Sequence, residues 1–134
     1  MKVKTDFVTN SSSSSFVAWG VRMNYDDMLK EKDLMDRAYF KYEEHNKGVA
    51  FEEFIESKRY EINEAVYSLL PYDYKGILEI SFGPEGDELL VGGTIHGLKD
   101  DQTLGDYKKQ IIEELKRIGI VTESLELIEE SWFN

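Results

Sequence analysis

The spacing of hydrophobic and polar residues divides the first half of the chain into one strand and two helices. The apolar, β-prone run at residues 16–22 predicts a buried strand. Residues 25–44 repeat apolar side chains at helical spacing behind Asn24, a common N-cap residue, and predict a helix. Residues 51–70 have the strongest such period in the chain. They predict a second helix, which Pro71 ends because the residue before a proline is pushed out of the α region.

The next segment alternates with a period of two, which is typical of half-buried strands. Residues 77–82 show this alternation, residues 83–87 have turn chemistry, and residues 88–96 return as a second strand. We therefore expect a β-hairpin. The pair Gly92-Gly93 inside its second strand predicts a bulge, or a place where another element packs closely on the backbone.

A helical period returns towards the end of the chain. Residues 104–118 predict a helix that Thr103 caps, since an aspartate three residues further on completes the spacing of a capping box. Residues 124–129 predict a last strand, with Leu125 and Leu127 on one face.

These elements follow one another in the order β-α-α-β-β-α-β. When the two early helices are counted as one crossover, this order is the split β-α-β pattern of ferredoxin-like sandwiches. We expect a single α+β domain over residues 1–134, with two layers and one mainly antiparallel sheet covered on one face by helices. Residues 1–15 would form a serine-rich leader, and residues 16–134 the globular body.

The leader has a composition of its own. Five consecutive serines, Ser11–Ser15, lie between the apolar pairs Phe7-Val8 and Phe16-Val17. Burial of a large apolar side chain contributes about 1.5–3 kcal/mol, so we expect both pairs to pack on the sheet. The stretch Lys-x-x-Phe-Val-Thr-Asn-Ser-Ser-Ser-Ser-Ser-Phe at residues 4–16 resembles a start shared by many small, mostly uncharacterised proteins of bacteriophages, prophages and their bacterial hosts. The resemblance implies a phage or prophage origin and supplies no catalytic residues.

Composition narrows the chemistry that the chain can carry. A hydrophobic fraction of 41%, with 13% aromatic residues, predicts a folded domain with a sizeable core. The absence of cysteine excludes thiol catalysis and thiolate metal sites, and it fits a cytoplasmic protein. No apolar run has the length of a membrane span, and no secretory signal follows Lys2 and Lys4. We expect no cofactor, no metal ion and no membrane partner.

The charge distribution indicates the kind of partner. The net charge is −11, and residues 61–134 contribute −10 of it, with 16 acidic and 6 basic side chains. An acidic field of this size repels nucleic acid and anionic lipid and attracts basic proteins. We therefore expect a basic protein partner and no direct binding of nucleic acid. An ordinary solvated acidic surface is the alternative.

Aromatic side chains contribute strongly to protein interfaces, so aromatic residues set among carboxylates form a candidate partner-binding surface. The candidates are Tyr72, Tyr74, Asp100, Asp101, Asp106, Glu113, Glu114, Trp132 and Phe133. They indicate a non-enzymatic accessory protein that acts by binding another protein. A sharper form of this hypothesis is an inhibitor of a host nucleic-acid-handling complex, in which carboxylates stand in for phosphates.

Two other functions stay open. The chain has no serine-hydrolase elbow and no nucleotide-binding glycine loop, and its only histidines are His45 and His96. Glu79, Ser81 and His96 could meet across the hairpin, and they are the candidates for a small enzyme site. An ordinary cross-strand polar pair of Glu79 and His96 is the simpler interpretation. A structural or assembly role is the third hypothesis.

Overall fold

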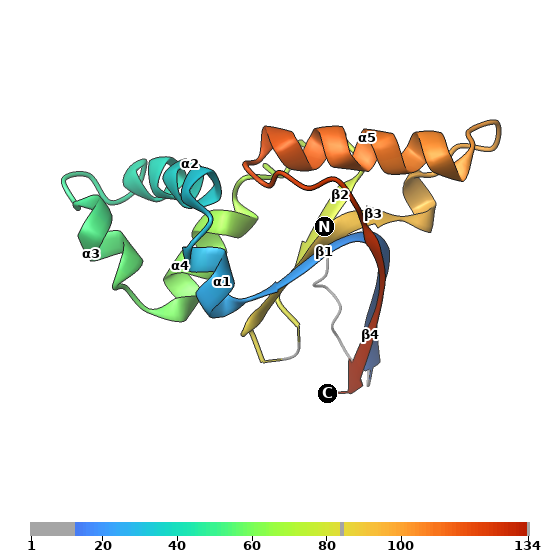
Figure 1. Cartoon of the computed structure of the whole chain (residues 1–134). Helices are drawn as coiled ribbons and strands as arrows, with labels where there is room; N and C mark the ends of the chain where they lie inside the picture. The colour runs from blue at the N-terminus through green and yellow to red at the C-terminus, as the bar shows by residue number, and fades with distance from the viewer. Residues whose placement is uncertain (1–12, 84, 134) are drawn as a thin grey trace.

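The computed structural model describes residues 13–83 and 85–133 (Figure 1). In chain order, the elements are β1 (Ser13–Asn24), α1 (Tyr25–Leu29), α2 (Lys32–Glu43), α3 (Phe51–Ile55), α4 (Arg59–Tyr67), β2 (Leu78–Ser81), β3 (Glu88–Thr94), the 3-10 helix η1 (Ile95–Gly97), α5 (Leu104–Arg117) and β4 (Glu126–Phe133). The fold is α+β, as the sequence predicts. The expected packing of Phe7 and Val8 lies outside the described residues.

One four-stranded sheet forms the centre of the fold, with the strand order β2-β3-β1-β4. Every neighbouring pair is antiparallel, which confirms the expected antiparallel sheet. The helical connections from β1 to β2 and from β3 to β4 each join two strands that have one strand between them. β1 is a long central strand, and its Gly20 lies opposite both Gly92 of β3 and Glu126 of β4.

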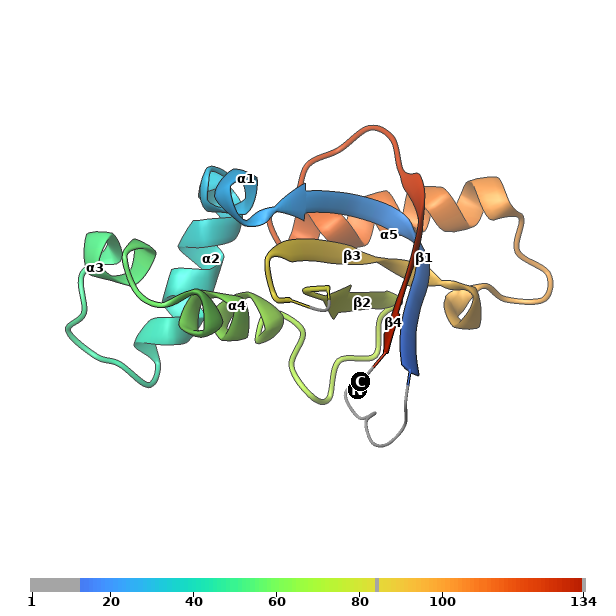
Figure 2. The same ribbon diagram turned by 90° about the horizontal axis from the view of Figure 1, so that it is seen from below.

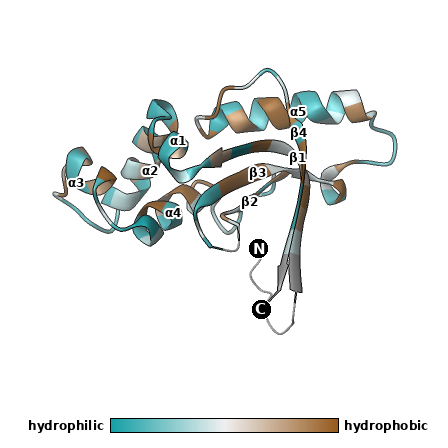
Figure 3. Ribbon diagram, turned by 60° about the horizontal axis from the view of Figure 1, so that its bottom comes forward, coloured by the Kyte–Doolittle hydropathy of each residue, from teal (hydrophilic) through white to brown (hydrophobic). Residues whose placement is uncertain are grey.

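α5 covers one face of the sheet, and hydrophilic and hydrophobic positions alternate along it (Figure 3). Its Tyr107, Ile111 and Leu115 are fully buried, as their helical spacing predicts. A Cβ on Gly93 would lie 2.6 Å from the Tyr107 hydroxyl and 2.8 Å from Ile111. A side chain at residue 93 would therefore force Tyr107 or Ile111 to shift where α5 packs onto β3, and the predicted close approach to the backbone at Gly92-Gly93 is confirmed.

The remaining helices, α1–α4, cluster beside the sheet rather than across it (Figures 1 and 2). Met28, Leu34, Phe54 and Ile62 of this cluster belong to the same buried core as α5 and the sheet. The main core thus lies on the α5 side of the sheet and continues into the helical cluster.

The prediction of one continuous helix over residues 25–44 is wrong. The backbone N–H of Lys30 donates to the Asp27 carbonyl at 3.1 Å, which is the tight bonding of a 3-10 turn, and this turn separates α1 from α2. Met28 and Leu34 are both buried. On an unbroken helix two residues six positions apart would point to different sides, so the turn is what lets both reach the core.

The helix predicted over residues 51–70 also divides, into α3 and α4. The Ser57 hydroxyl and the Ser57 backbone N–H both donate to the Phe54 carbonyl, at 2.6 and 3.0 Å. A serine that satisfies a carbonyl in this way competes with the helical bonding pattern, and α3 ends here. Lys58 then takes the N-cap position of α4.

The structure also corrects the last two strands. β3 ends at Thr94, and residues 95–97 form η1 instead of continuing the predicted strand. Among the β4 side chains that the structure describes, Ile128 is fully buried, whereas Leu127 is 49% exposed. Ile128 lies opposite Ala18 of β1, and the two belong to a small apolar cluster separate from the main core. This pairing sets the buried face of β4.

Candidate functional site

Among the described residues, no helix covers the sheet on the side opposite α5 (Figure 2). Side chains alternate between the two faces of a strand, so cross-strand pairs define which residues share this side. This helix-free face includes Phe16, Ala18, Gly20 and Arg22 of β1, Glu79 and Ser81 of β2, Glu88, Leu90, Gly92 and Thr94 of β3, and Glu126, Ile128 and Glu130 of β4. Four of these residues, Phe16, Ala18, Leu90 and Ile128, form the small apolar cluster.

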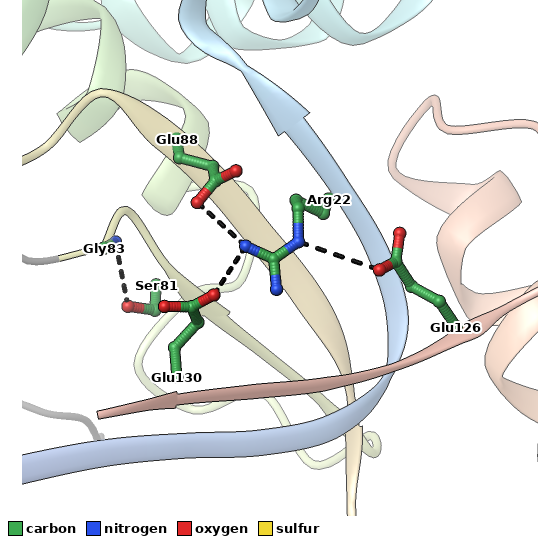
Figure 4. Close-up of polar contacts among 6 residues, drawn as sticks. All are labelled: Arg22, Ser81, Gly83, Glu88, Glu126 and Glu130. Carbon is green, nitrogen blue, oxygen red and sulfur yellow. Dashed lines mark hydrogen bonds and ion pairs between the residues drawn. The ribbon is translucent and has the colours of Figure 1, made fainter.

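Arg22 is the centre of an ion-pair network on the helix-free face (Figure 4). Its Nη1 lies 3.0 Å from Glu88 Oε1 and 2.7 Å from Glu130 Oε2, and its Nε lies 3.7 Å from Glu126 Oε1. The carboxylates come from β3 and β4, the strands on either side of β1, and for this reason one guanidinium can reach all three. The Arg22 side chain is 28% exposed, so the network is partly desolvated.

The surroundings of Arg22 favour its charged form. The hydrogen bond to Glu130 contributes most and raises the pKa of Arg22, burial lowers it, and the hydrogen bond to Glu88 raises it again. Arginine is protonated in proteins in any case, so its charge is fixed. One positive charge therefore faces three carboxylates, and the network keeps a negative balance.

Glu79 adds a fourth carboxylate to the helix-free face. It lies on β2 opposite Gly92, and its Oε2 accepts a hydrogen bond from the Thr94 hydroxyl at 2.9 Å. Thr94 is buried, with 7% exposure. A hydroxyl is a neutral partner, so it orients the Glu79 carboxylate without balancing its charge.

The exposed members of the predicted partner-binding set lie away from this network. Asp100 and Asp101 are exposed in the turn before α5, and Asp106 and Glu113 are exposed on α5 itself. Tyr72 is 98% exposed in the connection between α4 and β2. The structure thus leaves these five side chains accessible, and their part in binding stays a prediction.

Tyr74 and Glu114, two further members of the predicted set, bond to one another. The Tyr74 hydroxyl donates to Glu114 Oε1 at 2.6 Å and accepts from the Leu78 N–H at 3.1 Å. The other Glu114 oxygen lies 3.2 Å from Arg117 Nη1. Burial, and then the hydrogen bond to Glu114, raises the pKa of Tyr74. These contacts join the segment before β2 to α5, which gives both residues a structural role.

Trp132 and Phe133 complete the predicted set. Both lie in β4, where they are paired with Ser14 and Ser13 of β1. Only the backbone is described at these positions, so the structure adds nothing to the prediction that their side chains contact a partner.

The structure shows where the acidic excess of the C-terminal half lies. Residues 99–117, which include α5, hold five basic and five acidic side chains and have no net charge. The residues of the helix-free face instead hold four carboxylates, Glu79, Glu88, Glu126 and Glu130, against Arg22 alone. Four of the carboxylates behind the net charge of −10 therefore lie on the helix-free face, and the segment that carries most of the predicted acidic candidates contributes none of the excess.

Sequence periodicity alone does not pair Arg22 with its carboxylates, because Glu130 is 108 residues away. One signal was present in the sequence. Arg22 is the one cation in a long apolar run, and Glu126 and Glu130 have the even spacing that places residues on one face of a strand. Register between distant strands, which a single sequence does not give, brings the two patterns together.

Glu79, Ser81 and His96, the candidates for an enzyme site, do not meet. His96 is exposed in η1, beyond the end of β3, so the cross-strand pair of Glu79 and His96 is not formed. Ser81 Oγ accepts a hydrogen bond from the Gly83 N–H at 3.3 Å, while Glu79 bonds to Thr94. No hydrogen bond or ion pair between described residues joins His96 to Glu79 or Ser81.

Neither a search for metal and membrane features nor a comparison with known proteins assigns a function to the chain. Within residues 13–83 and 85–133, no three histidine, aspartate or glutamate side chains are grouped as metal ligands. No helix in this part of the chain is both long enough and apolar enough for a bilayer span. The chain matches no family model, and comparisons with curated proteins and with solved structures give no significant match.

Proposed function

We propose that this protein is a small, non-enzymatic accessory protein that binds a basic protein partner through its helix-free face. The observation that supports this most strongly is the charge of that face, which holds four carboxylates and one guanidinium. The apolar residues and the glycines of this face are buried, whereas Glu126 is exposed and Glu79, Glu88 and Glu130 are half-buried. The carboxylates are therefore the part of the face that a partner can reach.

Two carboxylates are best suited to meet lysine or arginine side chains of a partner. Glu79 is bonded to a neutral hydroxyl, and so it keeps its full negative charge for a new ion pair. Glu126 is 56% exposed, and its contact with Arg22 is the longest in the network, at 3.7 Å. Complementary charge of this kind raises association rates and selects among partners more than it adds affinity.

The sharper form of the proposal is an inhibitor that acts in the cytoplasm on a nucleic-acid-handling complex. Carboxylates held on adjacent strands would occupy a basic groove in place of phosphates. The resemblance of the leader to phage and prophage proteins fits this setting, because it implies a phage or prophage origin. The strand order β2-β3-β1-β4 with antiparallel pairing supports a ferredoxin-like classification as well.

An oligolysine peptide gives a defined basic probe for the face. The double variant Glu79→Gln/Glu126→Gln removes two charges from the helix-free face, and Glu52→Gln/Glu53→Gln removes two charges from exposed sites on α3, outside the predicted partner-binding set. We expect the first variant to weaken binding several-fold in a fluorescence-anisotropy titration and the second to stay close to the wild type. Equal weakening by the two variants would show that only the net charge matters and would contradict the proposal.

Identification of the natural partner uses the same pair of variants. A protein retained from host lysate by the wild type should also be retained by Glu52→Gln/Glu53→Gln and be lost with Glu79→Gln/Glu126→Gln. Retention should fall as salt rises, because exposed charge pairs are screened within a Debye length of about 8 Å at physiological ionic strength. A partner whose retention changes neither with the face variant nor with the salt concentration would bind to another surface of the protein.

A further inference from the structure

A second surface has the opposite charge character. A pocket of about 360 Å³ lies between α2, the turn after α4 and the C-terminal end of α5. Figure 1 shows this end of α5 next to α2. The two elements approach closely, since a Cβ on Gly119, just after α5, would lie 2.8 Å from the backbone nitrogen of Leu34. The size is that of pockets that bind small ligands or single peptide side chains.

The pocket is lined mainly by cations and apolar groups. Arg37, Lys41 and Arg117 supply three positive charges, and Asp36 is the one carboxylate of the lining. Asp36 is itself paired with Lys32, at 2.9 Å. The pocket is therefore positive in a chain whose net charge is −11.

The cations keep donors for a ligand. Arg37 bonds to Asp33 through Nε, and Arg117 bonds to Glu114 through Nη1, each at 3.2 Å and each at an exposed site. Such pairs are weak, and a guanidinium has five N–H donors, so both residues have donors left over. Lys41 forms no ion pair with any described residue.

The apolar part of the lining consists of Phe40, Leu69 and Ile118. Phe40 is 66% exposed, although it is one of the largest apolar side chains of the protein. Ile118 is almost fully buried and forms part of the floor. An exposed aromatic ring at the edge of an apolar floor is the kind of group that partner side chains cover.

We propose that this pocket binds an acidic segment of a protein partner, with an apolar side chain against Phe40 and Leu69 and a carboxylate among Arg37, Lys41 and Arg117. Charge complementarity supports this occupant. Beyond Lys41 a second, more polar pocket begins, which Glu61 and Glu64 line. These carboxylates repel an acidic ligand and confine it to the first pocket. The inference is independent of the helix-free face, which needs a partner of the opposite charge.

A protein segment fits these features better than a nucleic acid. A phosphate chain would be repelled by the overall negative charge along most of its length, whereas a short acidic segment needs only the local positive charge. The pocket is also too small to follow an extended polyanion, and its apolar floor suits a single side chain.

The probe is a short synthetic peptide with phenylalanine between aspartate and glutamate residues, titrated into the full-length, 15N-labelled protein. We expect saturable amide shifts confined to the pocket, at Arg37, Lys41, Leu69 and Ile118. The control peptide, with lysine in place of every acidic residue, should leave these amides unchanged. Shifts of equal size with both peptides, shifts elsewhere on the surface, or no saturation would overturn the proposal.

Two single variants separate the parts of the site. Lys41→Gln should weaken binding of the acidic peptide several-fold, and Phe40→Ser should weaken it by a similar factor without loss of folded spectra, since both side chains are at least partly exposed. Lys109→Gln removes one exposed charge of α5 outside the pocket and should bind like the wild type. The assignment is wrong if Lys109→Gln weakens binding as much as Lys41→Gln does. It is also wrong if a single-stranded oligothymidine shifts the same amides and binds with a lower dissociation constant than the peptide.

Discussion

Arg22 and Glu130 are 108 residues apart in the sequence, and their side chains meet at 2.7 Å on the helix-free face of the sheet. The contact joins the central strand β1 to the edge strand β4, and Glu88 joins the same guanidinium to β3. One side chain thus connects three of the four strands. The same side chain limits how negative the face becomes, so it affects both stability and the proposed recognition.

Replacement of Arg22 by methionine keeps much of the aliphatic stem and removes the charge. We expect a loss of about 1–2 kcal/mol in the free energy of unfolding, because three carboxylates then lie together without a cation. Lys32→Met breaks an exposed pair on α2 and should cost less than about 0.5 kcal/mol. Urea denaturation at low and high salt measures both values. Similar losses for the two variants would mean that the network adds no more than an ordinary surface pair.

The buried face of β4 can be tested with two neighbouring residues. Ile128 is fully buried, so Ile128→Ala should lower the free energy of unfolding by about 2–4 kcal/mol. Leu127 is 49% exposed, and Leu127→Ala should cost less than about 1 kcal/mol. Denaturant titration of the two variants decides the register. A larger loss at Leu127 would place the strand one residue out of register.

Two glycines associated with α5 should respond to alanine in opposite directions. Gly93→Ala places a Cβ 2.6 Å from the Tyr107 hydroxyl and should destabilise the protein by about 1–3 kcal/mol. Gly105 lies in the first turn of α5, where the nearest neighbouring atom would be 4.0 Å from a new Cβ. Gly105→Ala should therefore raise stability by about 0.5–1 kcal/mol, since alanine favours the helix. Thermal unfolding of both variants measures the difference in sign.

Stability should fall at alkaline pH because of Tyr107. Burial, with a smaller effect of the Glu79 charge, raises the pKa of Tyr107 to about 12, while an unfolded tyrosine ionises near pH 10. The folded state binds this proton more tightly. The contribution is therefore complete below about pH 10 and is lost as the pH rises towards 12.

Unfolding free energies between pH 9 and 12 measure this effect. Tyr107→Phe also loses the hydrogen bond that the hydroxyl donates to the Thr94 carbonyl, so it starts from a lower stability but should show a flatter decline. Tyr72→Phe, at a site that is 98% exposed, serves as the control and should keep the wild-type slope. An unchanged slope in Tyr107→Phe would contradict the assigned cause.

Features with local signals could be predicted from the sequence. The last helix is one, because its cap, its period and its end depend on residues within one or two turns. Thr103 Oγ1 accepts the Asp106 N–H at 3.1 Å, as the capping spacing predicts. The hairpin and the α+β class also follow from local periods and their order.

Features decided by distant contacts could not be predicted. The run Leu125 to Ile128 fits two opposite strand faces, and only the pairing of Ile128 with Ala18 selects one. The break at Ser57 depends on the Ser57 hydroxyl, which donates to the Phe54 carbonyl at the end of the preceding helix. The spacing of apolar residues carries no sign of this hydrogen bond. For the candidate site, charge summed over half the chain gives the correct sign. It does not give the face, because the face depends on strand register.

The position of β1 has a consequence for synthesis on the ribosome. β1 is the first described strand to emerge, but its two neighbours, β3 and β4, emerge last. The nascent strand must therefore wait with both of its edges open until β3 has emerged, and with one edge open until residues 126–133 have left the exit tunnel. Long-range pairing of this kind slows folding and exposes the waiting strand to aggregation. Premature termination before β4 would thus leave the central strand of the sheet exposed to other chains.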